Sequence, residues 1–297
     1  MNPELKKRIA KAERSDKIIT GILYGVGGFF LLLLIFMAGY IIVRGLMDFK
    51  PQYLAFNKHG IGNQFFNTVY LVFLSLLVSV PIGVGAGIYL AEYAGQNKLT
   101  AAIRVSIESL SSLPSIVVGL FGYLVFILAT GMRWNIVAGA LSVSILSLPS
   151  ITTTTEDALR SLPKSYKQGS MALGATHWKA ITSVMLPACL PRIVTGVILA
   201  AGRGFGEAAA LLYTSGQTTN IRWNNWNLSS SMCPLNPFRT GETLALHIWS
   251  LRNEGALNPD ATQIANVTSM VLIVLTLAFT LGARVAMRKL TKKQIGE

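Results

Sequence analysis

Two charged residues inside an apolar run, Arg203 and Glu207, have the clearest chemical potential in this chain. They lie about one helical turn apart, so we expect them on the same face of a helix. A charge at the centre of a bilayer costs ~2.5–3.5 kcal/mol on insertion scales, so each needs a partner or water. Arg before Glu is the weaker order for a helical ion pair. We therefore expect the pair to serve a substrate pathway, with structural pairing as the alternative.

The chemistry that suits this pair is the recognition of an oxyanion. The guanidinium of Arg203 is permanently charged and presents a planar fork of donors, which fits tetrahedral oxyanions. Glu207 would repel a bare anion but can accept a hydrogen bond from a protonated one. Because phosphate keeps a proton near neutral pH and sulfate does not, the pair favours hydrogen phosphate over sulfate. The glycines at 202, 204 and 206 let another helix approach closely, so we expect another chain to complete the site.

A polar loop, residues 156–187, is the longest polar interruption in the middle of this hydrophobic chain. Pro163 should end the preceding helix and begin a short one over 164–173. Gly174 is placed to end that helix in a left-handed turn, and Thr176 to cap the next one. The residues left for an outside partner are Met171, Ala172 and Leu173. The alternative interpretation is a solvated hairpin that only reverses the chain.

The composition indicates a membrane protein. Of 297 residues, 52% are hydrophobic and 13% are charged, about half the share usual in soluble domains, with a mean hydropathy of +0.50. The net charge of +13 does not indicate nucleic acid as a partner, because the basic residues flank apolar runs in contact with lipid.

Several functional classes lack their signatures. Cys189, Cys233, His59 and His247 show no metal-ligand spacing. No P-loop, nucleophile elbow or zinc-hydrolase motif occurs, so we expect no bound cofactor, no catalytic residues and no enzyme activity in this chain.

The apolar runs predict an all-α, polytopic fold with about six transmembrane helices. The expected spans are 18–43, 65–90, 113–130, 134–152, 184–214 and 264–287. We expect a basic tail at 1–17, an uncleaved anchor at 18–43, and a transmembrane domain at 65–287. That domain includes the polar loop and an outer loop at 216–261, and a second basic tail covers 288–297.

The distribution of Lys and Arg predicts the orientation. With the N-terminus inside, 17 basic residues fall on the inner side and seven on the outer side. Both termini and the polar loop are therefore expected in the cytoplasm.

Three segments resemble the permeases of ABC importers. Glu156, Asp157 and Ala158 stand where that family has Glu-Ala-Ala, and Gly174 matches its glycine. The middle residue departs from the pattern, and the tail, Ile181 followed at a distance by Leu186-Pro187, is looser. The stretches LPSIVVGLFG at 113–122 and GRGFGEAAALLY at 202–213 are similar to the phosphate-specific permeases of the PstA type.

This resemblance implies a multi-pass permease of the bacterial cell membrane that passes inorganic phosphate inward. Its implied partners are a sister permease (PstC type), two copies of a cytoplasmic ATPase (PstB type) that binds the ATP, and an external phosphate-binding protein (PstS type). In this family the polar loop contacts the ATPase, and the transport arginine maps onto Arg203. The alternatives are a permease for molybdate or sulfate, and a membrane-embedded enzyme or signalling subunit.

Overall fold

The computed structural model describes residues 3–57, 60–95, 97–253 and 259–295, and the regular elements within these ranges are all helices. The α-helices are α1 Pro3–Met47, α2 Gly62–Ile88, α3 Lys98–Ser112, α4 Ser115–Gly122, α5 Ile136–Arg160, α6 Lys164–Ala172, α7 His177–Ala180, α8 Leu186–Phe205, α9 Ala209–Thr214, α10 Leu244–Asn253 and α11 Ala261–Ile295. A 3₁₀ helix covers Pro51–Leu54, and wider π-helical turns cover Tyr89–Tyr93, Tyr123–Leu128 and Ile181–Met185. The predicted all-α fold is confirmed, while residues 1–2 and 296–297 of the predicted tails, and His59, lie outside the described residues.

Five helical runs are long and apolar enough to cross a bilayer. They are Ala12–Met47, Gly62–Tyr93, Ile136–Arg160, His177–Phe205 and Ala261–Lys289. A sixth crossing exists only if α3 and the run Ser115–Leu128 count together, and these are bent by 104° to each other. The predicted number of about six is therefore confirmed, but two of the predicted spans are wrong in detail.

The first correction concerns the span predicted at 113–130. The helix that begins at Ser115 is preceded by a separate helix, α3, and the chain is extended at Leu113 and Pro114 between them. Proline lacks a backbone donor and disfavours a helical conformation in the residue before it, so the chain turns there. The result is a bent pair of short helices in place of one straight span.

The centre of the bundle is the contact between α2 and α5, the most extensive between any two helices described. Glycines of α2 make it close: a Cβ at Gly83 would lie 2.8 Å from Cγ2 of Ile151, and one at Gly87 would lie 2.8 Å from the carbonyl oxygen of Thr152. Helix α8 packs on α5 beside it. The absence of a side chain at these two glycines therefore permits the close packing of α2 on α5.

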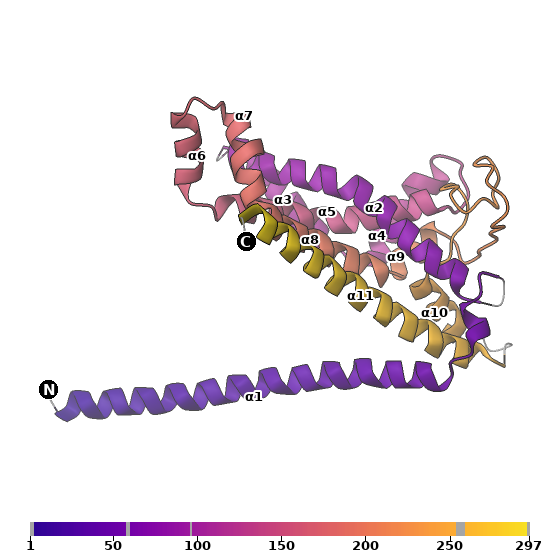
Figure 1. Cartoon of the computed structure of the whole chain (residues 1–297), viewed down its shortest axis with the longest axis horizontal. Coiled ribbons are helices and arrows are strands. Elements are labelled where there is room, and N and C mark those ends of the chain that lie inside the picture. Colours follow the sequence, from indigo (N-terminus) through magenta and orange to yellow (C-terminus); the bar gives the residue numbers. More distant parts are fainter. Residues whose placement is uncertain (1–2, 58–59, 96, 254–258, 296–297) are drawn as a thin grey trace.

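Helix α1 lies apart from the bundle over most of its length (Figure 1). It meets α11 at its C-terminal end, where a Cβ at Gly45 would come within 2.9 Å of the carbonyl oxygen of Asn266. The predicted tail and anchor are one continuous helix, since no break separates residues 1–17 from 18–43 within Pro3–Met47. The C-terminal tail likewise continues α11 as far as Ile295.

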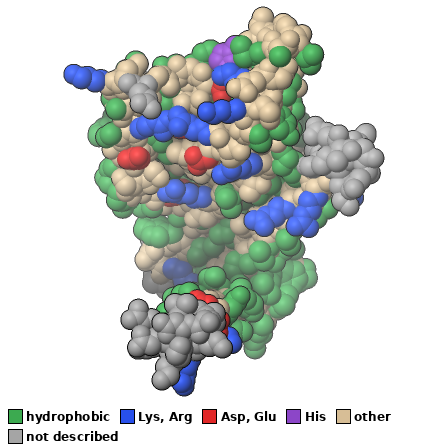
Figure 2. Space-filling model, turned by 90° about the vertical axis from the view of Figure 1, so that its left-hand side faces the viewer, with side chains coloured by type: hydrophobic (Ala, Val, Ile, Leu, Met, Phe, Trp, Pro, Cys, Tyr) green, Lys and Arg blue, Asp and Glu red, His purple; other side chains and the backbone are tan. Residues whose placement is uncertain are grey.

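The two ends of the molecule differ in charge. Both chain ends and α6 lie at one end, and the outer loop lies at the other (Figure 1). Figure 2 shows the first of these ends, where Lys and Arg side chains gather over the helices around the polar loop. The predicted orientation would place this end of the molecule in the cytoplasm.

The outer loop is organised around a buried arginine, Arg239, whose side chain is 2% exposed. Its Nη2 donates to Oδ1 of Asn67 at 2.7 Å and to the carbonyl oxygen of Pro234 at 2.9 Å, and its Nε donates to the carbonyl of Cys233 at 3.1 Å. Burial lowers the pKa of Arg239 to about 10, so the guanidinium stays charged at neutral pH. A buried charge satisfied by carbonyl oxygens fixes this loop against α2.

Candidate functional site: the polar loop and the helix break at Glu207

The polar loop folds as its capping signals predict. Helix α6 begins after Pro163, which stands at the N-cap, one position before the place predicted. Gly174 has φ +90°, and the hydrogen bonds Gly174 N to Met171 O (3.0 Å) and Ala175 N to Ser170 O (3.2 Å) close the helix in a Schellman motif. The side chain of Thr176 accepts a hydrogen bond from Lys179 N at 3.3 Å at the start of α7.

No residue of α6 is buried, so the whole helix is presented to an outside surface. Met171 and Leu173 are 45% and 92% exposed, and Ala172 is exposed between them. An apolar group displayed on a short helix, at the end of the molecule where basic residues gather, is a surface suited to contact with another protein.

Glu92 fastens this displayed helix to the bundle. It lies in the π-helical turn that ends the α2 span, and its Oε2 contacts Nζ of Lys167 on α6 at 2.7 Å and Nε2 of His177 on α7 at 3.0 Å. One carboxylate therefore joins both arms of the polar loop to the end of the α2 span. This contact holds α6 in position relative to the membrane-spanning helices.

Glu156 has a similar bridging role on α5. It is 5% exposed near the end of that helix and forms ion pairs with Arg104 of α3 and with Nε of Arg160 at 3.0 Å. Nη2 of Arg160 also donates to the carbonyl oxygen of Leu90 at 3.1 Å. The acidic residue at the predicted Glu-Ala-Ala position therefore ties α3 and α5 together and, through Arg160, reaches the end of the α2 span, while Asp157 is exposed.

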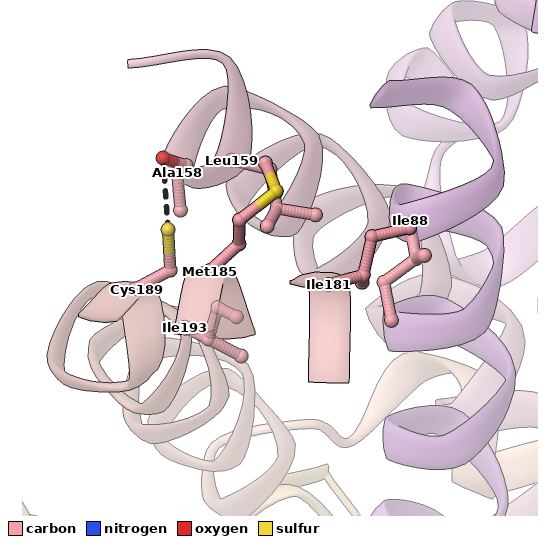
Figure 3. Close-up of a cluster of buried hydrophobic side chains, with 7 residues drawn as sticks. All are labelled: Ile88, Ala158, Leu159, Ile181, Met185, Cys189 and Ile193. Carbon is pink, nitrogen blue, oxygen red and sulfur yellow. Dashed lines mark hydrogen bonds between the residues drawn. The ribbon is translucent and has the colours of Figure 1, made fainter. Parts of the chain in front are cut away.

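The base of the polar loop is an apolar cluster, shown in Figure 3. Its members are Ile88, Ala158, Leu159, Ile181, Met185, Cys189 and Ile193. Ala158 is 1% exposed, and its carbonyl oxygen accepts a hydrogen bond from Sγ of Cys189 at 3.1 Å. Glu156 and Ala158 thus support the loop from inside, whereas the other residues predicted for an outside partner are exposed: Asp157, Met171, Ala172, Leu173 and Gly174.

The second correction concerns the span predicted at 184–214. Helix α8 ends at Phe205, the chain turns at Gly206 and Glu207, and the separate short helix α9 follows. Arg203 and Glu207 therefore do not share the face of one helix. No ion pair joins these two described residues.

Each of the two charges occupies its own environment. Glu207 is 8% exposed, and its Oε1 accepts a hydrogen bond from Ala210 N at 3.1 Å, which caps the first turn of α9. Arg203 is exposed in the last turn of α8, where its charge complements the negative end of the helix dipole. Among the described side chains it has no hydrogen-bond or ion-pair partner.

The bent pair α3–α4 supports this helix break. Helix α4 packs closely on α9, because a Cβ at Gly119 would lie 2.7 Å from Cα of Ala210. The two stretches that carried the resemblance, 113–122 and 202–213, are therefore neighbours in space. The bent pair α3–α4 thus packs against the broken segment α8–α9. Membrane proteins tolerate such interrupted helices where the backbone is buried in protein or lines a water-filled cavity.

Sequence reasoning did not single out Glu92 or Arg104, which the structure brings to the polar loop. One available signal was the position of Glu92 immediately after a long apolar run, where an acidic residue needs a partner. Within the described part of the chain, no group of three or more His, Cys, Asp or Glu side chains is arranged to hold a metal ion.

Comparison with known proteins places the chain in a family. Residues 83–294 match the family of binding-protein-dependent transport system inner membrane components. The probable ABC transporter permease protein YqgI of Bacillus subtilis is 44% identical, covering 91% of this chain and 94% of the relative. The phosphate transport system permease protein PstA of Xylella fastidiosa is 33% identical, covering 76% of this chain and 74% of the relative.

Solved structures share the fold. The bacterial alginate ABC transporter in complex with an alginate-bound periplasmic protein contains a chain with a TM-score of 0.64 and 18% identity, covering 96% of this chain and 99% of that one. The chain belongs to the family of binding-protein-dependent transport system inner membrane components, as a multi-pass ABC importer permease of the PstA type.

Proposed function

We propose that this chain is the permease subunit that carries inorganic phosphate inward across the bacterial cell membrane. The observation that carries the proposal is Arg203, an exposed guanidinium without a partner among the described side chains, at the end of an apolar span. An unpaired charge there is tolerated only where it meets water, a substrate or another subunit. The PstA relatives support phosphate as the substrate.

The proposed assembly follows from the two ends of the molecule. Helix α6 docks on a cytoplasmic ATPase of the PstB type, two copies of which hydrolyse ATP, and a sister permease of the PstC type faces Arg203. An external binding protein of the PstS type delivers phosphate to the side that carries the outer loop. Both termini of the chain are then cytoplasmic, in agreement with the distribution of basic residues.

The structure changes the expected roles of the two charges. Because Glu207 already caps α9 from a buried position, it acts on the substrate only through its remaining acceptor capacity and its negative charge. Arg203 is then the residue that binds the oxyanion. Glu207 stabilises the break between α8 and α9, beside which Arg203 is exposed.

The test of this proposal is Arg203→Lys in the assembled transporter. Transport of phosphate should fall at least tenfold although the charge is kept, because an ammonium group does not reproduce the guanidinium fork. Arg192→Lys is the matched control: Arg192 is another exposed arginine of α8, and its Nη1 donates to Oγ of Ser161 at 2.9 Å. Wild-type uptake in Arg203→Lys would refute a role in substrate binding.

Selectivity distinguishes phosphate from the alternative oxyanions. Glu207→Gln keeps an oxygen that can cap Ala210 N and removes the negative charge. Sulfate should then compete better with phosphate uptake, with the external binding protein held constant. Unchanged competition would remove Glu207 from the selectivity argument, and uptake of molybdate or sulfate in preference to phosphate by the wild type would assign the substrate to those anions.

A further inference from the structure

Two arginines converge on a small cavity at the junction of α1, α10 and α11. The cavity has a volume of about 330 Å³, within the range of small-molecule sites, ~300–1,000 Å³. It is lined by Tyr40, Ile41, Arg44, Arg252, Thr262, Asn266 and Ser269. It lies where the end of α1 meets the start of α11, far from α6 (Figure 1). We call it the Arg44–Arg252 pocket.

The close contact at Gly45 positions the first arginine. Because Gly45 lets α1 touch the backbone of α11 near Asn266, its neighbour Arg44 is brought to the edge of α11. The guanidinium of Arg44 lies 5.6 Å from the centre of the Tyr40 ring, and its Nε donates to the Tyr40 hydroxyl at 3.3 Å. The ring therefore supports the guanidinium from one side.

The second arginine is held by an amide. Nη2 of Arg252 donates to Oδ1 of Asn266 at 2.6 Å, and Nδ2 of Asn266 donates to Oδ2 of Asp48 at 2.6 Å. Asp48 thus lies on the other side of the asparagine and is not among the residues that line the pocket. Each guanidinium uses one of its five N–H groups in these contacts, so four remain to donate hydrogen bonds to a ligand.

The two arginines that line the pocket give it two positive charges. Neither Arg44 nor Arg252 forms an ion pair with a carboxylate in the described part of the chain. Two guanidinium groups beside the hydroxyl groups of Tyr40, Thr262 and Ser269 match an anion with several oxygens. Arginine pairs with phosphate through two parallel hydrogen bonds, and these are among the strongest that side chains make.

The position of the pocket points to the source of that anion. Arg44 lies in the last turn of one candidate span, Ala12–Met47, and the α11 residues of the pocket lie in the first three turns of another, Ala261–Lys289. Both spans have exposed apolar side chains deeper in the membrane, such as Met37, 53% exposed, and Leu277, 49% exposed. A headgroup in the pocket would therefore have acyl chains directly alongside lipid-facing helices.

We infer that the Arg44–Arg252 pocket binds the phosphate group of a membrane phospholipid and so fixes the end of α1 against α11. This site is separate from Arg203 and does not depend on which solute the chain transports. Its ligand is a boundary lipid, and its occupation adds a charged contact to the packing of α1 on α11.

The test uses the full chain, purified in nonionic detergent and examined by native mass spectrometry with added dioleoylphosphatidylglycerol. The wild type should retain the lipid, and the double variant Arg44→Gln with Arg252→Gln should bind it about tenfold or more weakly. Dioleoylglycerol, which has the same chains without phosphate, should not bind at this site. Arg222→Gln, at an exposed arginine of the outer loop, is the control and should bind as the wild type does.

A second variant guards against a folding defect in the first. Ser269→Leu fills the pocket and leaves both arginines in place, and the Ser269 hydroxyl bonds only within its own helix, to the Ala265 carbonyl at 2.7 Å. It should also lose the lipid. Equal lipid retention by the wild type and both variants would overturn the inference. Displacement of the lipid by 10 mM inorganic phosphate would also overturn it, because the ligand would then be the soluble anion; this concentration is roughly ten-thousandfold above a micromolar Kd.

Discussion

The ion pairs of Glu92 give the sharpest test of how the displayed helix is held. Replacing Glu92 by Gln keeps the shape of the side chain and one acceptor oxygen but removes the charge shared by Lys167 and His177. Breaking a fully buried pair costs ~3–5 kcal/mol, and an exposed pair is worth ~0–1 kcal/mol. The Glu92 side chain is 10% exposed and its partners are 35% and 31% exposed, so the loss should be about 1–2 kcal/mol.

That loss should appear as local opening of the polar loop and not as global unfolding. A change of one to two kcal/mol alters an opening equilibrium by about 5–30-fold. Hydrogen exchange of peptides covering α6 should accelerate by this factor, while peptides from α2 and α5 keep their rates. Glu108→Gln, at an exposed glutamate of α3 without a described ion pair, should change nothing. Unchanged exchange in α6 of Glu92→Gln would refute the assignment of Glu92 as its anchor.

The remaining predictions concern the turn after α6, the orientation and the outer loop. Gly174→Asp should leave the chain in the membrane but reduce co-purification of the ATPase, because φ +90° strains any residue with a side chain. The control Gly169→Ala, inside α6 with open space around it, should leave co-purification unchanged. Cysteines at Lys167 and at Leu228, 63% exposed, should show opposite access to an impermeant reagent in a cysteine-free background, and labelling of both from outside would overturn the orientation. Arg239→Lys should lower thermal stability by about 1.5–3 kcal/mol, since an ammonium group does not reach all the carbonyls that the guanidinium joins; an unchanged melting temperature would contradict that role.

Local signals in the sequence were sufficient for the polar loop. The turn at Gly174 and the cap at Thr176 each depend on residues within one helical turn, so their rules apply without knowledge of the tertiary structure. The break after Phe205 was missed, because the apolar run continues through it and the glycines indicated only close packing. Its cause lies partly outside the run, in Gly119 of α4, which packs on Ala210.

Long-range electrostatic contacts were beyond sequence reasoning. Glu92 and Lys167 are 75 positions apart, and Glu156 and Arg104 are 52 apart. Only the folded arrangement of α2, α3 and α5 brings them together. The expectation that Arg203 and Glu207 share one helix face was wrong for the complementary reason: spacing in sequence predicts a shared face only while the helix is continuous.

The π-helical turns give the α2 and α8 spans a mechanical property that a regular helix lacks. One of them, Tyr89–Tyr93, carries Glu92, which contacts the polar loop, and another, Ile181–Met185, lies near the C-terminal end of that loop. The hydrogen bond from Ala94 N to Tyr89 O spans five residues. Each wide turn holds one surplus residue relative to an α-helix. If the wide turn moved by one position along the helix, the segment on one side of it would rotate by about 100° and shift by ~1.5 Å relative to the other side. The backbone hydrogen bonds of the helix would re-form after the move. A displacement of α6 can thus rotate the half of the helix next to the polar loop, while the half beyond the wide turn stays packed in the bundle.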